Sequence, residues 1–483
     1  MATPVLLKTD FRPLASFTFD EAADVLGCPA LKTGGGVRIA AISTDSRTLR
    51  EGEVFLALRG ENFDGHEHLA QAISKGAAGL IIDAGASVPV GCDLPILKVP
   101  DALTAYGDLA RHLRATWPGK VTAISGSVGK TTTRRLVAHA LRQKSKVLEP
   151  IKNFNNLIGL PKTLLELEKS HEVAVLELGM NLPGELARLT DIASPDVACL
   201  TQIGRAHLGQ FENIEALAAA KLSLFRTSRA DCALVVNLGC AYSSKALEEL
   251  KAHHKTITFR AEHGKNGQDP GEVDVYLDKV RPAPDFGIAF DLTVSGERHE
   301  NVTAPLFGMH QSESLAAAAA ILLALGEDAE LFLRSLDSFK GEPLRAEIAK
   351  AGGATFILDC YNAAPEAMGG ALESLAVYPW AGRRILVLAD MLELGDHSGD
   401  AHNGLLAPLE RLAPDFLFTL GPEMARIGKR AGEQSATTVC SFDSRTDLQI
   451  ALEKNIGTGD LIFVKGARGF ELEKVVQPLI EKG

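Results

Sequence analysis

The stretch Val121–Thr131, which reads VTAISGSVGKT, decides the fold of this 483-residue chain. Its apolar run Val121–Ile124 predicts a strand, and a helix is expected over Lys130–Gln143. The glycines between them let backbone N–H groups turn toward phosphate oxygens, and the helix offers the positive end of its dipole. The common phosphate-binding loop has a further glycine where this chain has Ile124, so the loop is the shorter G-x-x-G-K-T form. An ordinary strand-to-helix turn is the alternative interpretation.

Three residues near this loop suit nucleotide and magnesium binding. Lys130 is expected to neutralise the outer phosphates of a nucleotide, and Thr131 to bind magnesium. Glu177 ends a predicted strand, Val173–Leu178, and its carboxylate is placed to bind magnesium directly or through water. A solvated strand end is the alternative for Glu177.

Two more side chains are candidates on weaker grounds. His207 follows a third predicted strand, Val197–Thr201, and a lone histidine is more often structural than a metal ligand. Lys221 lies on the apolar stripe of a predicted helix, although a buried ammonium is costly unless it is paired or chemically changed. Periodicity alone favours a lysine that snorkels at the edge of the stripe. The stripe consists of Ile214, Leu217, Ala218, Lys221 and Phe225.

The run NFNNLIGLP at 153–161 is dense in amides and ends in a Gly/Pro break. It predicts a loop that enters a helix. Its amides are expected either to contact a polar substrate or to cap the turn.

Alternation of short apolar runs with helical segments predicts an α/β protein with three domains, at 1–117, 118–341 and 342–483. The Trp117–Gly119 turn separates the first two. The central domain is expected to be a mostly parallel sheet of the phosphate-loop type, and the third a Rossmann-like sheet. Further expected elements are strands at Val54–Leu58, Gly79–Asp83, Thr355–Leu358, Ile385–Leu388, Phe416–Leu420 and Leu461–Val464, an antiparallel strand at Phe286–Val294 and an Ala-rich helix at Leu315–Leu325.

The composition of the chain argues against several classes of protein. The net charge of -11 argues against broad nucleic-acid or anionic-membrane binding. The seven scattered cysteines lack a C-x-x-C pair and predict reduced thiols. No signal peptide is recognised, and the longest apolar run is too short to insert into a membrane. The sequence therefore predicts a cytoplasmic protein that acts on small molecules, and a monomer is expected, although no sequence feature measures the oligomeric state.

Motifs along nearly the whole chain, in this order, resemble those of the Mur ligase superfamily, whose members form peptide-type bonds on cell-wall precursors. These motifs are Ser43–Arg47, Gly52–Gly60, Phe63–His66, the loop Gly126–Thr131, Asn153–Leu165, Glu177–Asn181, Asp359–Ala363, Asp390–Gly395 and Val464–Arg468.

The resemblance implies a UDP-sugar domain at the N-terminus, ATP as cosubstrate and two magnesium ions. It implies that Thr131 and Glu177 bind one magnesium and His207 the second, and that Lys221 is carbamylated and supports magnesium. Lys130, His207 and Lys221 are the implied catalytic residues. The implied nucleotide ligands are Gly126, Ser127, Gly129, Lys130, Thr131, Thr132, His310, Gln311, Arg345 and Asp359, and the implied substrate ligands are Ser46, Arg47, Asn153, Asn156, Tyr361 and Asn362.

The activity implied is joining of D-alanyl-D-alanine to a UDP-muramoyl-tripeptide through an acyl phosphate. Alternatives are another amino acid ligase of the superfamily, or a catalytically weak relative that binds UDP-sugar or nucleotide. A D-N-P-R motif, which members that add diaminopimelate carry, is absent. The chain departs from the family pattern at Gln311, where the family has asparagine, at Gly209, where it has glutamate, and at Ala364 and Ala367.

Overall fold

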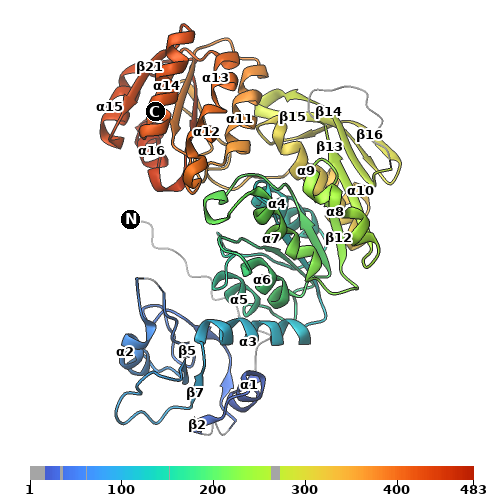
Figure 1. Ribbon diagram of the computed structural model, residues 1–483, viewed down its shortest axis with the longest axis vertical. Helices are drawn as coiled ribbons and strands as arrows, with labels where there is room; N and C mark the ends of the chain where they lie inside the picture. Colours follow the sequence, from blue (N-terminus) through green and yellow to red (C-terminus); the bar gives the residue numbers. More distant parts are fainter. Residues whose placement is uncertain (1–16, 33–35, 61, 152, 263–271, 483) are drawn as a thin grey trace.

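The computed structural model describes residues 17–32, 36–60, 62–151, 153–262 and 272–482 (Figure 1). Its elements form three main sheets, each of which lies within one of the predicted ranges 1–117, 118–341 and 342–483. The α/β class is therefore confirmed, while the boundaries of the domains stay a prediction. Among the described residues, none of the helices has the length and apolar character that a membrane span needs.

The N-terminal part contains a five-stranded sheet with the order β2-β7-β6-β5-β4, and a small antiparallel pair, β1 and β3. Its strands are β1 Phe17–Thr18, β2 Ala30–Lys32, β3 Arg38–Ile39, β4 Ile42–Ser43, β5 Val54–Leu56, β6 Gly79–Asp83 and β7 Ile96–Val99. Its helices are α1 Phe19–Leu26, η1 Gly65–His68, α2 Leu69–Ser74 and α3 Ala102–Thr116.

The central part contains a nine-stranded sheet with the order β16-β15-β14-β13-β12-β11-β8-β10-β9. It is parallel from β9 to β14, and β15 and β16 add an antiparallel edge, as predicted for 286–294. The strands are β8 Lys120–Ser125, β9 Val147–Leu148, β10 Val173–Glu177, β11 Val197–Leu200, β12 Ala233–Asn237, β13 Thr256–Ala261, β14 Val275–Ala283, β15 Gly287–Val294 and β16 Glu297–Ala304. The helices are α4 Lys130–Leu141, α5 Gly159–Leu164, α6 Glu185–Ala193, α7 Ile214–Arg226, α8 Ala241–Lys251, α9 Ser312–Leu325 and α10 Ala329–Leu336, with short turns η2 Leu208–Gln210, η3 Pro284–Phe286 and η4 Met309–Gln311.

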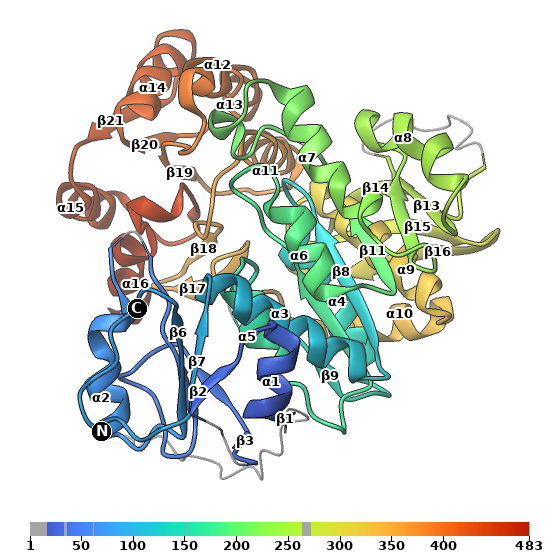
Figure 2. The same cartoon turned by 60° about the horizontal axis from the view of Figure 1, so that its bottom comes forward.

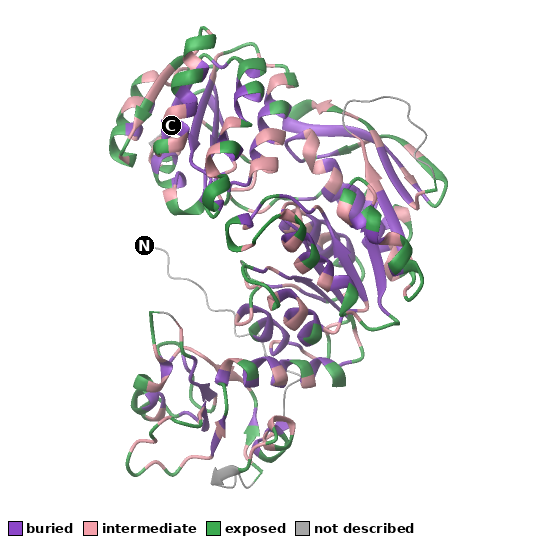
Figure 3. Cartoon of the chain, viewed as in Figure 1, coloured by how far each residue is buried: buried purple, intermediate pink, exposed green. Residues whose placement is uncertain are grey.

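Helices cover both faces of the central sheet, and its strands are the buried interior of Figure 3. Ala123 of β8 packs into the core shared with α3, α5, α6 and α7, whereas Ile124 packs into the core shared with α4, α9 and α10. This alternation follows from the two-residue side-chain period of a strand. A parallel sheet covered on both faces brings the carboxyl ends of its strands to one open edge, where the loop after β8 lies.

The C-terminal part contains a six-stranded sheet with the order β17-β18-β22-β19-β20-β21, parallel except for β17 (Figure 2). Its strands are β17 Glu347–Ala351, β18 Ala354–Leu358, β19 Arg384–Ala389, β20 Phe416–Leu420, β21 Thr438–Phe442 and β22 Leu461–Lys465. Its helices are α11 Pro365–Val377, α12 Ser398–Asn403, α13 Leu406–Leu412, α14 Pro422–Gln434, α15 Arg445–Asn455 and α16 Glu473–Lys482, with turns η5 Gly395–His397 and η6 Arg468–Phe470.

An aromatic cluster fixes the C-terminal part against the central sheet. Phe286 and Phe307, which flank β15 and β16, are buried in the core of the C-terminal part. The ring of Phe286 stacks on Tyr378 with 4.7 Å between centroids, and the Phe286 amide donates to the Tyr378 hydroxyl at 2.9 Å. Because this contact combines apolar burial with a satisfied hydrogen bond, it is a firm attachment point between the two parts.

The junction between α3 and the central sheet depends on a buried arginine. Arg114 donates to Asp196 at 2.7 Å and to the carbonyl of Ser194 at 3.1 Å. The same carboxylate oxygen of Asp196 accepts the amide of Val121 at 2.8 Å. Since Arg114 is 5% exposed, its loss removes a buried cation from beside Asp196 and a hydrogen-bond donor from several carbonyl oxygens.

We expect Arg114→Ala to lower the free energy of unfolding by about 3 kcal/mol, because a buried charge pair loses one member. Arg111→Ala is the matched control, since Arg111 lies on the same helix and makes only exposed pairs with Asp108 and Asp191. That variant is expected to lose less than about 1 kcal/mol. Urea unfolding followed by circular dichroism measures both, and equal losses contradict the role given to Arg114.

Candidate active site

The loop after β8 has the strand–loop–helix setting that the sequence predicts. It runs from the end of β8 at Ser125 to the start of α4 at Lys130. Gly126 and Gly129 have φ of 144° and 83°, which side-chain-bearing residues rarely adopt. A Cβ atom on Gly126 would lie 2.1 Å from the Thr201 hydroxyl, so only glycine fits there. The loop therefore keeps its close backbone path at the open edge of the sheet.

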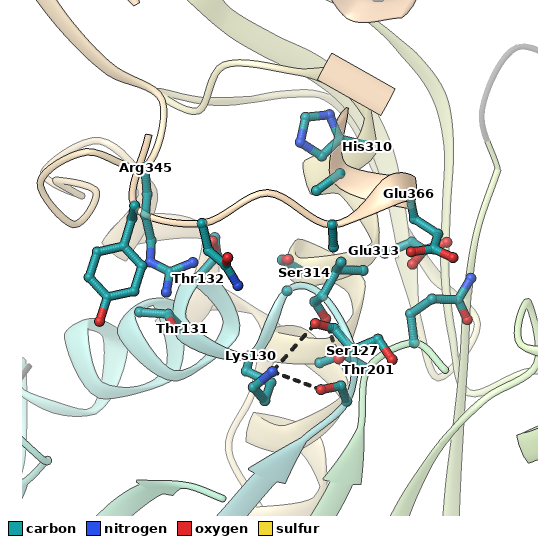
Figure 4. A pocket seen from close by; sticks show the side chains of 18 of the residues that line it. Ser127, Lys130, Thr131, Thr132, Thr201, His310, Glu313, Ser314, Arg345 and Glu366 are labelled. Carbon is teal, nitrogen blue, oxygen red and sulfur yellow. Dashed lines mark hydrogen bonds between the residues drawn. The ribbon is translucent and has the colours of Figure 1, made fainter. Parts of the chain in front are cut away.

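Lys130 and Glu177 bring opposite charges to the mouth of the loop. The Lys130 ammonium donates to the carbonyl oxygens of Gly126 at 2.8 Å and Ser127 at 3.4 Å, as the dashed lines of Figure 4 show. Glu177 ends β10 and is 4% exposed. Burial lowers the pKa of Lys130, although the charge of Glu177 opposes this effect. Burial also acts to raise the pKa of Glu177, but the charges of Lys130 and Arg345 lower it below its usual range.

Both carboxylate oxygens of Glu177 are held in place. The Thr131 hydroxyl donates to Oε2 at 2.8 Å, and the Asn155 amide donates to Oε1 at 2.9 Å. Asn155 was not among the predicted site residues, although it lies in the same amide-dense run as Asn153 and Asn156, which were predicted. Asn156 caps the start of α5, because its side-chain oxygen accepts the amide of Gly159 at 2.8 Å. Asn156 thus has the capping role that was the alternative for this run, and it also borders the pocket.

Lys221 is buried, so the prediction of a snorkelling lysine is wrong. Its side chain lies on the inner face of α7 and is 1% exposed. Burial and the nearby positive charge of Lys130 lower the pKa of Lys221 to about 7. Helical periodicity gave the direction of the side chain, but the depth of burial depends on neighbouring elements that pack over α7.

His207 connects the central part to the C-terminal part. Its Nδ1 lies 2.6 Å from a carboxylate oxygen of Glu393, which precedes η5. Burial and the charge of Lys130 lower the pKa of His207, although Glu393 opposes the shift. The sequence did not predict Glu393 as a partner. The two residues are far apart in the chain, and only the docking of the two parts brings them together.

Residues of the C-terminal part form the opposite wall. The Arg345 guanidinium lies over the ring of Tyr361 at 4.3 Å. Asp359, directly after β18, pairs with Lys465 at the end of β22, and this lysine was not among the predicted site residues. The charge of Lys465 is thus fixed beside Asp359 at the carboxyl ends of two neighbouring strands.

One pocket of about 550 Å³ gathers most of the predicted site residues. Figure 4 shows Arg345 on one side of Lys130 and Glu366 on the other. Glu313, whose pKa burial raises to about 7, also borders it and was not predicted. The predicted residues that line the pocket are Gly126, Ser127, Gly129, Lys130, Thr131, Thr132, Asn153, Asn156, Glu177, His207, Lys221, His310, Gln311, Arg345, Asp359, Tyr361 and Asn362.

Ser46 and Arg47 do not line this pocket; they lie between β4 and β5 of the N-terminal part. The Ser46 hydroxyl donates to the Gln71 side chain at 2.8 Å, and Arg47 pairs with Asp45 at 2.8 Å. Hydrogen bonding from Arg47 lowers the pKa of Asp45 to about 2. The structure therefore separates these two predicted substrate ligands from the nucleotide loop.

The close contact of η2 with η5 explains why residue 209 is a glycine. A Cβ atom on Gly209 would lie 2.7 Å from the amide nitrogen of Gly395 and 3.1 Å from the carbonyl oxygen of Glu393. The backbones of the two parts approach too closely here for a side chain. The glycine thus permits the contact that sets Glu393 beside His207.

Three family descriptions match consecutive segments of the chain: the catalytic domain of the Mur ligase family over 38–114, the Mur ligase middle domain over 124–322 and the Mur ligase glutamate ligase domain over 344–468. The chain is 34% identical to UDP-N-acetylmuramoyl-tripeptide--D-alanyl-D-alanine ligase of Synechocystis over 92% of both chains. It is 32% identical to the enzyme of the same name from Bacillus subtilis, over 92% of this chain and 93% of the relative.

Solved structures agree with these sequence matches. MurF from Acinetobacter baumannii aligns with a TM-score of 0.85 and 29% identity, over 97% of this chain and all of that one (100%). MurF ligase from Thermotoga maritima in complex with ADP aligns with a TM-score of 0.79 and 26% identity, over 92% of this chain and 97% of that one.

Proposed function

The chain belongs to the Mur ligase family, and we propose that it joins D-alanyl-D-alanine to UDP-N-acetylmuramoyl-tripeptide while ATP is converted to ADP and phosphate. The observation that carries this proposal is similarity along most of the chain to relatives that bear this name, with 34% identity over 92% of both chains for the enzyme from Synechocystis. The pocket supports it, because a phosphate loop faces charged residues of the C-terminal part across one cavity.

The reaction requires two transfers. The terminal carboxylate of the tripeptide attacks the γ-phosphorus of ATP, which forms an acyl phosphate and releases ADP. The amine of the dipeptide then attacks the acyl carbon, loses a proton and displaces phosphate, so that an amide bond forms. Negative charge grows on the transferred phosphoryl group, and Lys130 with the backbone N–H groups of the loop supplies the opposing charge.

The residues at the loop fit a magnesium ion. Glu177 is ionised because its pKa lies below the usual range, and the Thr131 hydroxyl lies 2.8 Å from it. Carboxylate and hydroxyl oxygens are the ligands that magnesium prefers, and the ion neutralises phosphate charge when it is bound. Within the described part of the chain no group of three or more His, Cys, Asp and Glu side chains can hold a metal. Magnesium bound at Thr131 and Glu177 would thus take its other ligands from phosphate oxygens and water.

We further propose that Lys221 carries a carbamate and, with His207, serves a second magnesium ion. Carbamylation joins the neutral amine to carbon dioxide and releases a proton. The pKa of about 7 gives Lys221 a large neutral fraction at neutral pH, unlike an ordinary lysine. The modification also replaces the repulsion between Lys221 and Lys130 with attraction. The protein is proposed to act as a monomer in the cytoplasm, where ATP is available.

Phosphate release decides between this activity and its alternatives. We expect release with ATP, magnesium and UDP-muramoyl-tripeptide to depend on D-alanyl-D-alanine. Release that depends on a single amino acid would assign the chain to another Mur-type ligase. Absence of release with every amino donor would leave only a catalytically weak relative that binds UDP-sugar or nucleotide.

A further inference from the structure

A second cavity, of about 510 Å³, adjoins the first one between the central and C-terminal parts. We call it the side pocket. Its walls come from the segment 203–214, which ends at the start of α7, from Tyr242 of α8, and from α11, η5 and α12. Glu366 is the described residue that lines both the side pocket and the nucleotide pocket, so the two cavities meet at this residue.

Only one of the two oxygens of the Glu366 carboxylate has a hydrogen-bond partner among the described residues. Its Oε1 accepts the amide of Arg205 at 2.9 Å. Its Oε2 is buried and has no hydrogen-bond partner among the described residues. A buried carboxylate oxygen without a donor is costly, and an ammonium group in the cavity would supply that donor.

Arg205 provides the opposite charge in the same cavity. Its side chain is exposed and lines the side pocket. No ion pair or side-chain hydrogen bond is found for its guanidinium within the described ranges. A guanidinium group without a partner is suited to bind a carboxylate, because it can donate two parallel hydrogen bonds to the two carboxylate oxygens.

We propose that the side pocket binds the acceptor dipeptide as a zwitterion, with its ammonium group at Glu366 and its terminal carboxylate at Arg205. This inference rests on the proposed function. The buried side chains Ile203 and Leu208 line the same cavity and suit the methyl groups of two alanyl residues. The exposed carboxylates Glu212 and Asp400 also line the cavity and add negative charge to it.

The position of the side pocket suits attack on an acyl phosphate formed over the loop. The Gly204 carbonyl, which borders the side pocket, accepts a hydrogen bond from the Ser127 hydroxyl of the loop at 2.9 Å. The amine at Glu366 therefore lies at the edge of the pocket in which phosphoryl transfer takes place. Glu366 is thus a binding residue for the acceptor, and Arg205 sets its orientation from the other end.

The test compares D-alanyl-D-alanine with its C-terminal amide, which lacks the carboxylate. We expect the wild type to prefer the dipeptide by more than about tenfold in kcat/KM, since a site built for a charged group rejects an analogue without it. Arg205→Ala should lower kcat/KM for the dipeptide by about tenfold or more and remove this preference. Glu366→Gln should raise KM for both acceptors. KM for ATP should stay within about twofold in each variant.

Arg334→Ala on α10 and Glu410→Gln on α13 are matched controls, because both side chains are exposed and line neither cavity. They are expected to keep the wild-type preference and KM values. A wild type that releases no phosphate with the dipeptide overturns the proposed function and, with it, this inference. An active wild type whose preference for the carboxylate survives in Arg205→Ala overturns the inference alone.

Discussion

Lys130→Ala is expected to lower kcat by on the order of a thousandfold, since it removes a cation aimed at charge that grows in the transition state. Lys130 is the first residue of α4, and in the structure its ammonium is held by two carbonyl oxygens of the loop. Phosphate oxygens compete with these carbonyl oxygens for the Lys130 ammonium when a nucleotide binds. Because an alanine leaves the loop backbone intact, nucleotide affinity should fall much less than kcat.

Single-turnover phosphate release and titration with a fluorescent ADP analogue measure the two effects separately. Lys245→Ala is the control, because Lys245 is an exposed lysine of α8. The thermal transition of Lys130→Ala should match that of the wild type. A Lys130→Ala enzyme with more than about a tenth of wild-type kcat would remove this lysine from the transition state.

Much of the fold was predictable because its signals are local. The apolar run before Gly126 and the helix after it follow from side-chain periodicity and from glycine conformation. The structure gives a strand at Lys120–Ser125 and a helix at Lys130–Leu141, each within two residues of the prediction. Four strands of the third sheet, β18, β19, β20 and β22, followed from the same alternation, whereas β17 and β21 were not predicted.

Contacts between the parts of the chain were not predictable from local pattern. The pairing of His207 with Glu393 requires the close approach of Gly209 and Gly395, which no periodicity encodes. Asn155 was missed because three neighbouring asparagines give the same local signal, and only the fold aims this one at Glu177. The sequence therefore predicted which residues of each motif form the site, but it did not predict the partner side chains that orient those residues.

Lys221→Ala is expected to lower kcat by on the order of a hundredfold, as loss of a group that supports a metal does. Added bicarbonate should not restore activity, because the variant has no amine to carbamylate. Short carboxylic acids should restore part of it, since they can place an anion in the space that the side chain leaves. Activity assays with formate and acetate over a range of concentrations test this recovery, and full activity of Lys221→Ala would contradict the proposed role.

The carbamate itself is testable through its pH dependence in the wild type. Only the neutral amine reacts with carbon dioxide, so its population rises as the pH increases through the Lys221 pKa of about 7. Carbamylation also releases a proton, which favours the product further at higher pH. A carbamate carbon signal from labelled bicarbonate should therefore grow between one unit below and one unit above that pKa, and Lys221→Ala should lack it. A signal that falls over this interval would contradict the proposal, because burial and the charge of Lys130 would then not be what makes this lysine reactive.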